Sequence, residues 1–236
     1  MNLVWHIIRK DLRRLAWAYG AWAVAGGYLI VYRNLNIVQR SIWDNVGIVA
    51  LFTFLALGIA LIATVIQEDG LCGANEFWRT RPIAAGRLLT AKLVLVLASF
   101  AVIPMAFALA LRPGQGGEFG AIGALSIYVL ALAAVAACTK DLGQFLLVAV
   151  GCVMIAPALG GVLASVGPVG ELTKPEAVSL SVTKIMLLHG IIGCAALGIL
   201  INQYLTRRTR LSRWALATTV TVVALISGLW RWPLFG

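Results

Sequence analysis

The residues whose types could support specific chemistry gather in one polar segment, Gln67–Lys92, which lies between two apolar stretches. This segment, the long polar loop, places two aromatic side chains beside two arginines. Because Arg81 precedes Pro82, a short helix around Ala74–Thr80 should end there. A second helix should begin near Ala84 and run into the third apolar stretch. Aromatic and arginine side chains commonly anchor contacts between proteins. The chemistry expected of the loop is therefore the docking of a partner protein, through Glu76, Phe77, Trp78, Arg79, Thr80, Arg81 and Pro82.

A second interpretation of the same segment stays open. Tryptophan and arginine also settle among lipid headgroups, where a short helix lies in the plane of the membrane. From physical chemistry alone, a docking helix and a headgroup anchor are equally well supported.

Catalytic signatures are absent from the sequence. There is no nucleotide-binding G-x-x-x-x-G-K-[ST] motif, no H-E-x-x-H and no G-x-S-x-G. The four cysteines, Cys72, Cys138, Cys152 and Cys194, form no C-x-x-C pair, so neither a metal site nor a disulfide framework is indicated. We expect a non-catalytic chain with no catalytic residue, no metal ligand and no cofactor.

Ion coupling is also disfavoured. Carriers driven by protons or sodium keep ionisable groups inside the membrane, and seven apolar stretches of this chain contain no Asp, Glu, Lys or Arg. His189 is the one ionisable side chain of note within them. A single histidine of this kind is more often hydrogen-bonded or interfacial than a proton relay.

The apolar stretches predict the fold. A helix needs roughly 20 apolar residues to cross a bilayer, and backbone groups in lipid must be satisfied within the element. We expect an all-α integral membrane protein with six to seven transmembrane helices. The seventh stretch is among the shortest, and whether it crosses fully is left open. The stretches are Leu15–Val31, Val46–Ile66, Leu93–Leu111, Ala121–Cys138, Phe145–Val166, Ile185–Leu205 and Trp214–Trp230.

The net charge of +10 follows the predicted topology, so nucleic acid is not expected as a partner. With the N-terminus in the cytoplasm, the inside segments hold 13 lysines and arginines and the outside segments hold 6. Such a bias in short loops orients membrane proteins. We expect a bacterial inner-membrane protein with its N-terminus in the cytoplasm and anionic lipid headgroups as the counter-charge.

Residues 1–14 predict an amphipathic helix ahead of a polytopic domain at 15–236. Val4, Ile8 and Leu12 fall on one face, with other apolar residues beside them. The opposite face is polar and basic, as in helices that lie in the headgroup plane. Its members are Asn2, His6, Arg9, Lys10, Arg13 and Arg14. The alternative is that this helix is a cytoplasmic extension of the first span.

The long polar loop resembles a motif of the permease subunits of type-2 ABC transporters, the ABC-2 family. An acidic, glycine-containing stretch leads there to Pro-Ile, then to an arginine and to a lysine that opens the next span. The helix Met1–Arg14 resembles the family's elbow helix. Two features depart from the pattern: Ala84-Ala85 stands where Ser-Arg is usual, and seven apolar stretches stand where six are typical. The matching residues are Glu68, Asp69, Gly70, Pro82, Ile83, Arg87 and Lys92.

The resemblance implies a membrane-spanning permease subunit that pairs with a second permease subunit, identical or not. Cytoplasmic ABC ATPase subunits would supply the energy, and the loop would couple them to the spans. The family contains mainly exporters, which favours export. The alternative from another class is a non-transporting membrane anchor or assembly subunit that uses the same loop to recruit a soluble partner.

Overall fold

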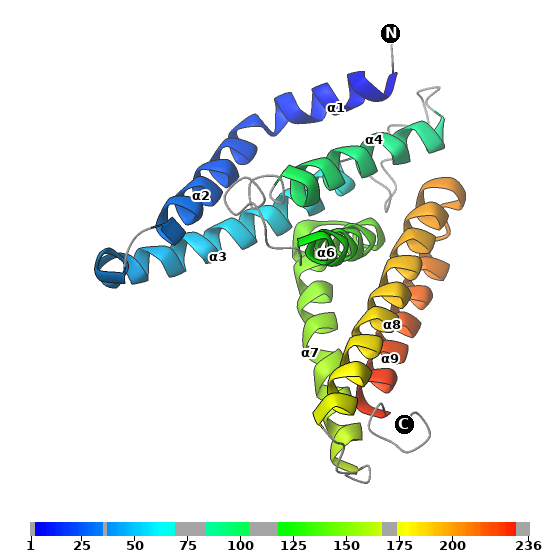
Figure 1. Cartoon of the computed structure of the whole chain (residues 1–236). Helices are drawn as coiled ribbons and strands as arrows, with labels where there is room; N and C mark the ends of the chain where they lie inside the picture. The colour runs from blue at the N-terminus through cyan, green and yellow to red at the C-terminus, as the bar shows by residue number, and fades with distance from the viewer. Residues whose placement is uncertain (1–2, 35–36, 69–83, 104–117, 167–173, 230–236) are drawn as a thin grey trace.

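The computed structural model describes residues 3–34, 37–68, 84–103, 118–166 and 174–229 of the chain, and within them all regular structure is helical (Figure 1). The helices are α1 (Leu3–Arg14), α2 (Ala16–Asn34), α3 (Ile37–Gln67), α4 (Ala85–Leu97), η2 (Ala98–Val102), α6 (Glu118–Cys138), α7 (Leu142–Val166), α8 (Lys174–Ile201), η3 (Asn202–Thr206) and α9 (Thr209–Leu229).

Four of these helical segments are long and apolar enough to cross a membrane. They are Val46–Gln67, Ala85–Val102, Thr183–Thr206 and Thr209–Gly228. The fourth contains most of the seventh predicted stretch, so its helix has the length and composition that a crossing requires. Two shorter apolar helical segments, Gly123–Cys138 and Leu142–Ile155, lie within α6 and α7. The all-α prediction is confirmed in the described residues, where four helical segments have the length and composition of membrane spans; six to seven spans are not confirmed.

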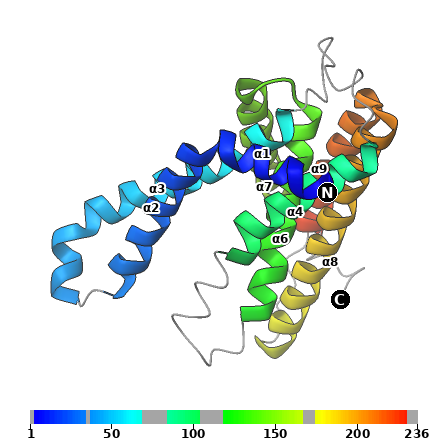
Figure 2. The same cartoon turned by 90° about the horizontal axis from the view of Figure 1, so that it is seen from above.

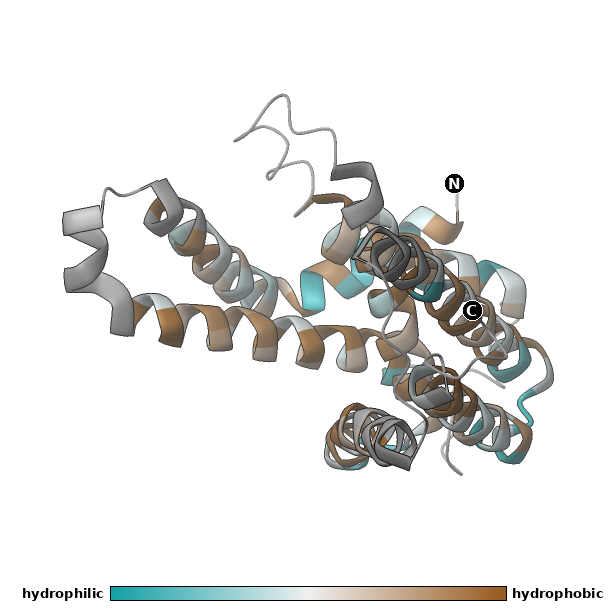
Figure 3. Ribbon diagram, turned by 60° about the horizontal axis from the view of Figure 1, so that its bottom comes forward, coloured by the Kyte–Doolittle hydropathy of each residue, from teal (hydrophilic) through white to brown (hydrophobic). Residues whose placement is uncertain are grey.

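The helices form two groups that diverge from a common centre. In Figures 1 and 2 the hairpin of α2 and α3 extends to one side, while α7, α8 and α9 extend together in another direction. Figure 3 shows apolar residues recurring along the longer helix of the protruding hairpin. The N-terminal helix α1 continues into α2 through a bend at Leu15, whose N–H still bonds to the Asp11 carbonyl at 3.0 Å.

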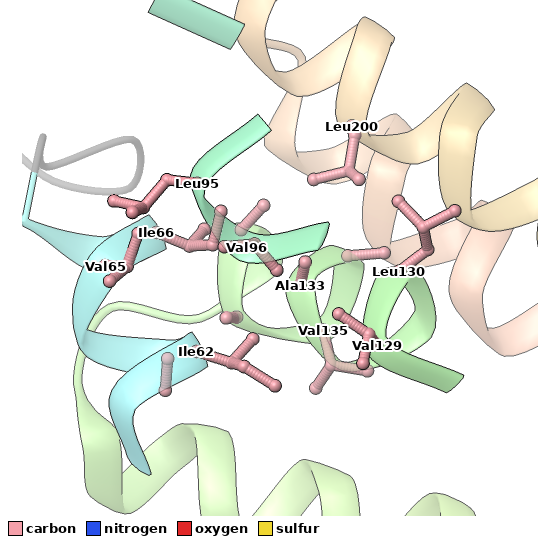
Figure 4. Close-up of a cluster of buried hydrophobic side chains, with 14 of the residues drawn as sticks. Ile62, Val65, Ile66, Leu95, Val96, Val129, Leu130, Ala133, Val135 and Leu200 are labelled. Carbon is pink, nitrogen blue, oxygen red and sulfur yellow. The ribbon is translucent and has the colours of Figure 1, made fainter. Parts of the chain in front are cut away.

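The buried core lies where α3, α4, α6 and α8 meet (Figure 4). Val65 and Ile66 from the end of α3 pack there with Val96 of α4 and Leu200 of α8, each at most 1% exposed. Alanines of α6, such as Ala133 at 0% exposure, let these helices approach closely. The core thus fixes the end of α3 and the course of α4, the two helices that flank the long polar loop.

An aromatic cluster joins the hairpin to this core. The Trp22 ring stacks on Phe54 with ring centroids 4.9 Å apart and meets Phe100 edge to face at 5.0 Å. Gly58 makes room for Trp22, because a Cβ at that position would lie 3.0 Å from the indole Nε1. These contacts tie α2 and α3 to η2, the π-helical turn that follows α4.

α1 lies at one end of the bundle. The last residues of α3 and α6 and the first residues of α4, α7 and α9 lie at the same end. We call it the α1 end. At α7, Asp141 caps the helix by accepting a hydrogen bond from the Gln144 N–H at 2.8 Å. At η3, the chain leaves the helix through Arg207, the one non-glycine residue with positive φ in the described ranges (φ 58°).

Candidate functional site: a buried charge cluster at the base of the long polar loop

The residues predicted to dock a partner, Glu76 through Pro82, lie outside the described residues. The predicted helix around Ala74–Thr80 and Cys72 lie there too. The structure does describe both ends of the loop, where Glu68 follows α3 and α4 begins at Ala85. That start of α4 agrees with the helix predicted to begin near Ala84 and to run into the third span.

A pair of opposite charges is buried where α1 crosses α4. The Lys92 Nζ donates to the Asp11 carboxylate at 2.8 Å and to the Val65 carbonyl at 2.7 Å. The side chains of Lys92 and Asp11 are 1% and 0% exposed. Burying an ionised group is costly unless it is paired and hydrogen-bonded, and here one lysine joins three helices: α1, α3 and α4.

Glu68 adds a second ion pair beside the first. The Arg14 guanidinium lies 2.6 Å from the Glu68 carboxylate, and the Lys10 ammonium lies 3.5 Å from it. The Glu68 side chain is 6% exposed, whereas those of Lys10 and Arg14 face outward. We call the five residues Lys10, Asp11, Arg14, Glu68 and Lys92 the charge cluster. With three cations and two carboxylates it carries a formal charge of +1.

The charge cluster perturbs the ionisation of Asp11. Burial raises the pKa of the Asp11 carboxyl above its ordinary value, and the nearby Lys92 ammonium offsets part of that effect. Glu68 raises the Asp11 pKa further through like-charge repulsion, while Lys10 lowers it. Among its neighbours, Lys92 is the group that most favours the charged form of Asp11.

These contacts bear on two sequence predictions. The spans were expected to exclude every charged side chain. This prediction is wrong for the third span, because α4 begins earlier than the apolar stretch Leu93–Leu111 and Lys92 lies within the candidate span Ala85–Val102. The apolar face of α1 was predicted to lie among headgroups, and this placement stays a prediction. Part of that face packs on the protein, since Ile7 and Ile8 are buried in the core, while Leu12 is 37% exposed.

Further polar contacts extend from the charge cluster across the α1 end. The Gln67 amide donates to the Thr139 hydroxyl at 2.9 Å and to the Asp141 carbonyl at 3.1 Å. The Arg213 Nε donates to the Cys138 carbonyl at 3.2 Å. The end of α3 is thereby connected to the α6–α7 turn, and that turn to α9.

The charge cluster joins helices through ion pairs and hydrogen bonds. Across the described ranges, no group of three or more His, Cys, Asp or Glu side chains could hold a metal ion. Both carboxylates of the charge cluster are paired with cations. What the charge cluster does is hold both flanks of the long polar loop against one helix, α1.

Sequence reasoning missed Asp11 and the pairing of Lys92, although a signal was present. Val4, Ile8, Asp11 and Leu15 follow the 4-3-4 spacing of one helix face, so Asp11 interrupts an apolar stripe. In α4, Lys92 likewise falls between Leu88 and Leu95 at 4-3 spacing and interrupts an apolar stripe. Two opposite charges, each alone on an apolar helix face, indicate a buried pair.

Comparison with known proteins gave no match among family models, among curated proteins or among solved structures.

Proposed function

We propose that this chain is the membrane-spanning permease subunit of an ATP-driven transporter of the ABC-2 kind. It would be non-catalytic, work as an exporter, and draw its energy from a separate cytoplasmic ATPase subunit. The observation that carries the proposal is the charge cluster, in which Lys92, Glu68 and Asp11 tie both flanks of the long polar loop to α1. The resemblance of the loop to the ABC-2 motif adds to it.

The charge cluster supplies a physical route for coupling. A loop without a core of its own transmits force only if its base is fixed to the helices that must move. Lys92 fixes α4 to α1 and to the end of α3. Closure of an ATPase dimer against Phe77–Arg81 would then displace α1 and α4 together. Two such permease subunits, identical or not, would form the pathway between them.

In the proposed topology the chain crosses the bacterial inner membrane seven times, and its N-terminus lies in the cytoplasm. Besides the four candidate spans, α2, α6 and α7 would cross, with 19, 21 and 25 residues. These lengths lie near the roughly 20 residues that a crossing requires. In this arrangement the α1 end faces the cytoplasm, where an ATPase would bind.

Cys72 tests this topology directly. Because it lies in the long polar loop, a membrane-impermeant maleimide should leave it unlabelled in intact cells and label it after permeabilisation. A variant that lacks Cys138, Cys152 and Cys194, three free cysteines in helices, makes the signal specific. Labelling of Cys72 from outside intact cells would reverse the topology.

Transport, where it occurs, is expected to be independent of a proton gradient. The His189 Nδ1 lies 2.7 Å from the Ile185 carbonyl in its own helix, and its ring meets Tyr128 edge to face at 5.4 Å. These contacts fit a histidine that supports packing. His189→Ala should leave flux unchanged, and an imposed pH difference should drive none in ATP-free vesicles. Flux that follows the pH difference and disappears in His189→Ala would contradict this prediction.

The direct test of function is reconstitution. The chain would be co-expressed with candidate cytoplasmic ABC ATPases of the same genome, purified with the one that binds it and placed in vesicles. Flux of amphipathic fluorescent dyes is then followed with and without ATP. ATP-dependent flux that disappears when the ATPase is inactivated supports a permease. Stable association with a soluble partner, without any flux or stimulated ATP hydrolysis, would instead identify a membrane anchor.

A further inference from the structure

A groove of about 530 Å³ lies between α7 and α9 and reaches the α1 end. Its volume falls within the roughly 300–1,000 Å³ typical of sites for small molecules. The walls are mostly apolar: Leu147, Gly151 and Ile155 of α7 face Leu216 and Val220 of α9. No member of the charge cluster is among the described residues that line it.

The depth of the groove matches one leaflet of a membrane. Its α9 wall runs from Arg213 to Thr221 and its α7 wall from Leu147 to Ile155. Each wall covers eight residue steps, or about 12 Å along a helix. Half of a bilayer's hydrocarbon core is about 15 Å. The groove thus has the reach of one acyl chain from the α1 end, and it is too short for a path across the membrane.

The mouth of the groove is polar and basic. Arg213 lines it together with Thr139 and Gln144. Arg213 also lines an adjoining hollow with Arg210 and Trp214, so the two cavities share one arginine.

The surrounding charges favour an anion at this mouth. No carboxylate of the described residues forms an ion pair with Arg208, Arg210 or Arg213. Asp141, in the α6–α7 turn next to Lys140, uses its Oδ1 to cap α7. Basic pockets between membrane helices are typical binding sites for anionic lipid headgroups.

We propose that the groove between α7 and α9 binds one anionic phospholipid from the leaflet at the α1 end. The phosphate lies against Arg213 and Arg210, and one acyl chain occupies the apolar groove beside Gly151. Trp214, 65% exposed and next to both arginines, sits at the depth of the headgroup. This site does not depend on transport, because it requires only that α7 and α9 lie in a membrane.

A larger side chain at Gly151 should fill the groove. A Cβ at Gly151 meets no atom within 4 Å, so Gly151→Leu extends into the groove without displacing the protein. Leucine is also the better helix former. Gly190 of α8 is the matched control, because a Cβ there also meets nothing within 4 Å and the residue does not line the groove.

The experiment is native mass spectrometry of the purified chain after equilibration with phosphatidylglycerol and phosphatidylcholine that carry the same acyl chains. Wild type and Gly190→Leu should each retain one phosphatidylglycerol, with at least a tenfold preference over phosphatidylcholine. In Gly151→Leu the fraction of protein that retains the lipid should fall at least tenfold. Arg210→Gln/Arg213→Gln should bind the two phospholipids equally. A large excess of glycerol phosphate, which lacks acyl chains, should not displace the lipid.

Three results would overturn the lipid site. They are equal retention of the two phospholipids by wild type, unchanged retention in Gly151→Leu, and displacement of the lipid by glycerol phosphate alone. The last would identify an anion site without an acyl chain. Circular dichroism and gel filtration of Gly151→Leu and Gly190→Leu must coincide, so that lipid loss cannot come from unfolding.

Discussion

Lys92→Met is expected to destabilise the protein by about 3–5 kcal/mol, because it leaves the Asp11 carboxylate buried without its partner. Asp11 is 0% exposed, and in the wild type the Lys92 ammonium donates to it at 2.8 Å. The substitution also removes a donor from the Val65 carbonyl. The measurement is the free energy of unfolding in detergent micelles, followed by helical circular dichroism against denaturant.

A double variant distinguishes the destabilisation caused by an unpaired buried Asp11 from the net contribution of the ion pair to the free energy of unfolding. Replacing a whole buried ion pair by apolar side chains is often neutral or stabilising, by up to about 4 kcal/mol. Asp11→Val/Lys92→Met should therefore recover most of the stability that Lys92→Met loses. Arg87→Met is the matched control: Arg87 lies in the same helix but is exposed, so its change should stay within about 0.5 kcal/mol. Equal losses in Lys92→Met and Arg87→Met would mean that the pair is not buried in the folded protein.

The same double variant bears on function. If the charge cluster only stabilises the fold, Asp11→Val/Lys92→Met should transport as well as wild type. If ATPase movement reaches α4 through this contact, the double variant should fold, bind the ATPase and yet hydrolyse ATP without matching flux. We expect the second result, because the pair joins α1 to both flanks of the long polar loop.

The helices were predictable from the sequence because their signal is local. An apolar stretch such as Val46–Ile66 must form a helix in lipid whatever surrounds it, and α3 extends through all of it. The start of α4 near Ala84 was predictable for a similar reason, since Pro82 disfavours helix just before it.

The buried pair could not be reached in the same way, because it depends on tertiary contact. Asp11 and Lys92 are 81 residues apart in the chain. The count of lysines and arginines in each loop places Lys92 in the polar loop before the apolar stretch Leu93–Leu111. That count does not consider on which face of α4 the side chain lies. The contact of α1 with α4 buries Ile7 and Ile8. A hydropathy pattern does not predict this contact, because the apolar face of an amphipathic helix packs equally well on lipid or on protein. The groove between α7 and α9 was not predictable for the same reason, because it depends on how these two helices pack against each other.

Trp78→Ala combined with Arg81→Glu is expected to weaken association with the ATPase roughly thirtyfold. The loss of a buried aromatic anchor and the reversal of a contact charge commonly cost about 2 kcal/mol or more at such contacts, and about 1.4 kcal/mol is tenfold in affinity. Neither residue lies in an apolar stretch, so membrane insertion should be unchanged. The measurement is the amount of ATPase that co-purifies with the chain at matched membrane levels, together with substrate-stimulated ATP hydrolysis.

The matched control carries the same kinds of change elsewhere at the α1 end. Trp17 of α2 is 93% exposed and Lys140 is exposed in the α6–α7 turn, so Trp17→Ala/Lys140→Glu removes one tryptophan and reverses one charge outside the long polar loop. This control should keep its ATPase, because the loop is the proposed docking element. Full retention of the ATPase and of stimulated hydrolysis by Trp78→Ala/Arg81→Glu would show that the loop is a headgroup anchor. Loss in both double variants would point to surface charge at the α1 end as a whole. Loss in the loop variant alone, with insertion and helix content intact, would assign the contact to Phe77–Arg81 and leave the charge cluster as the part that passes the motion to α4.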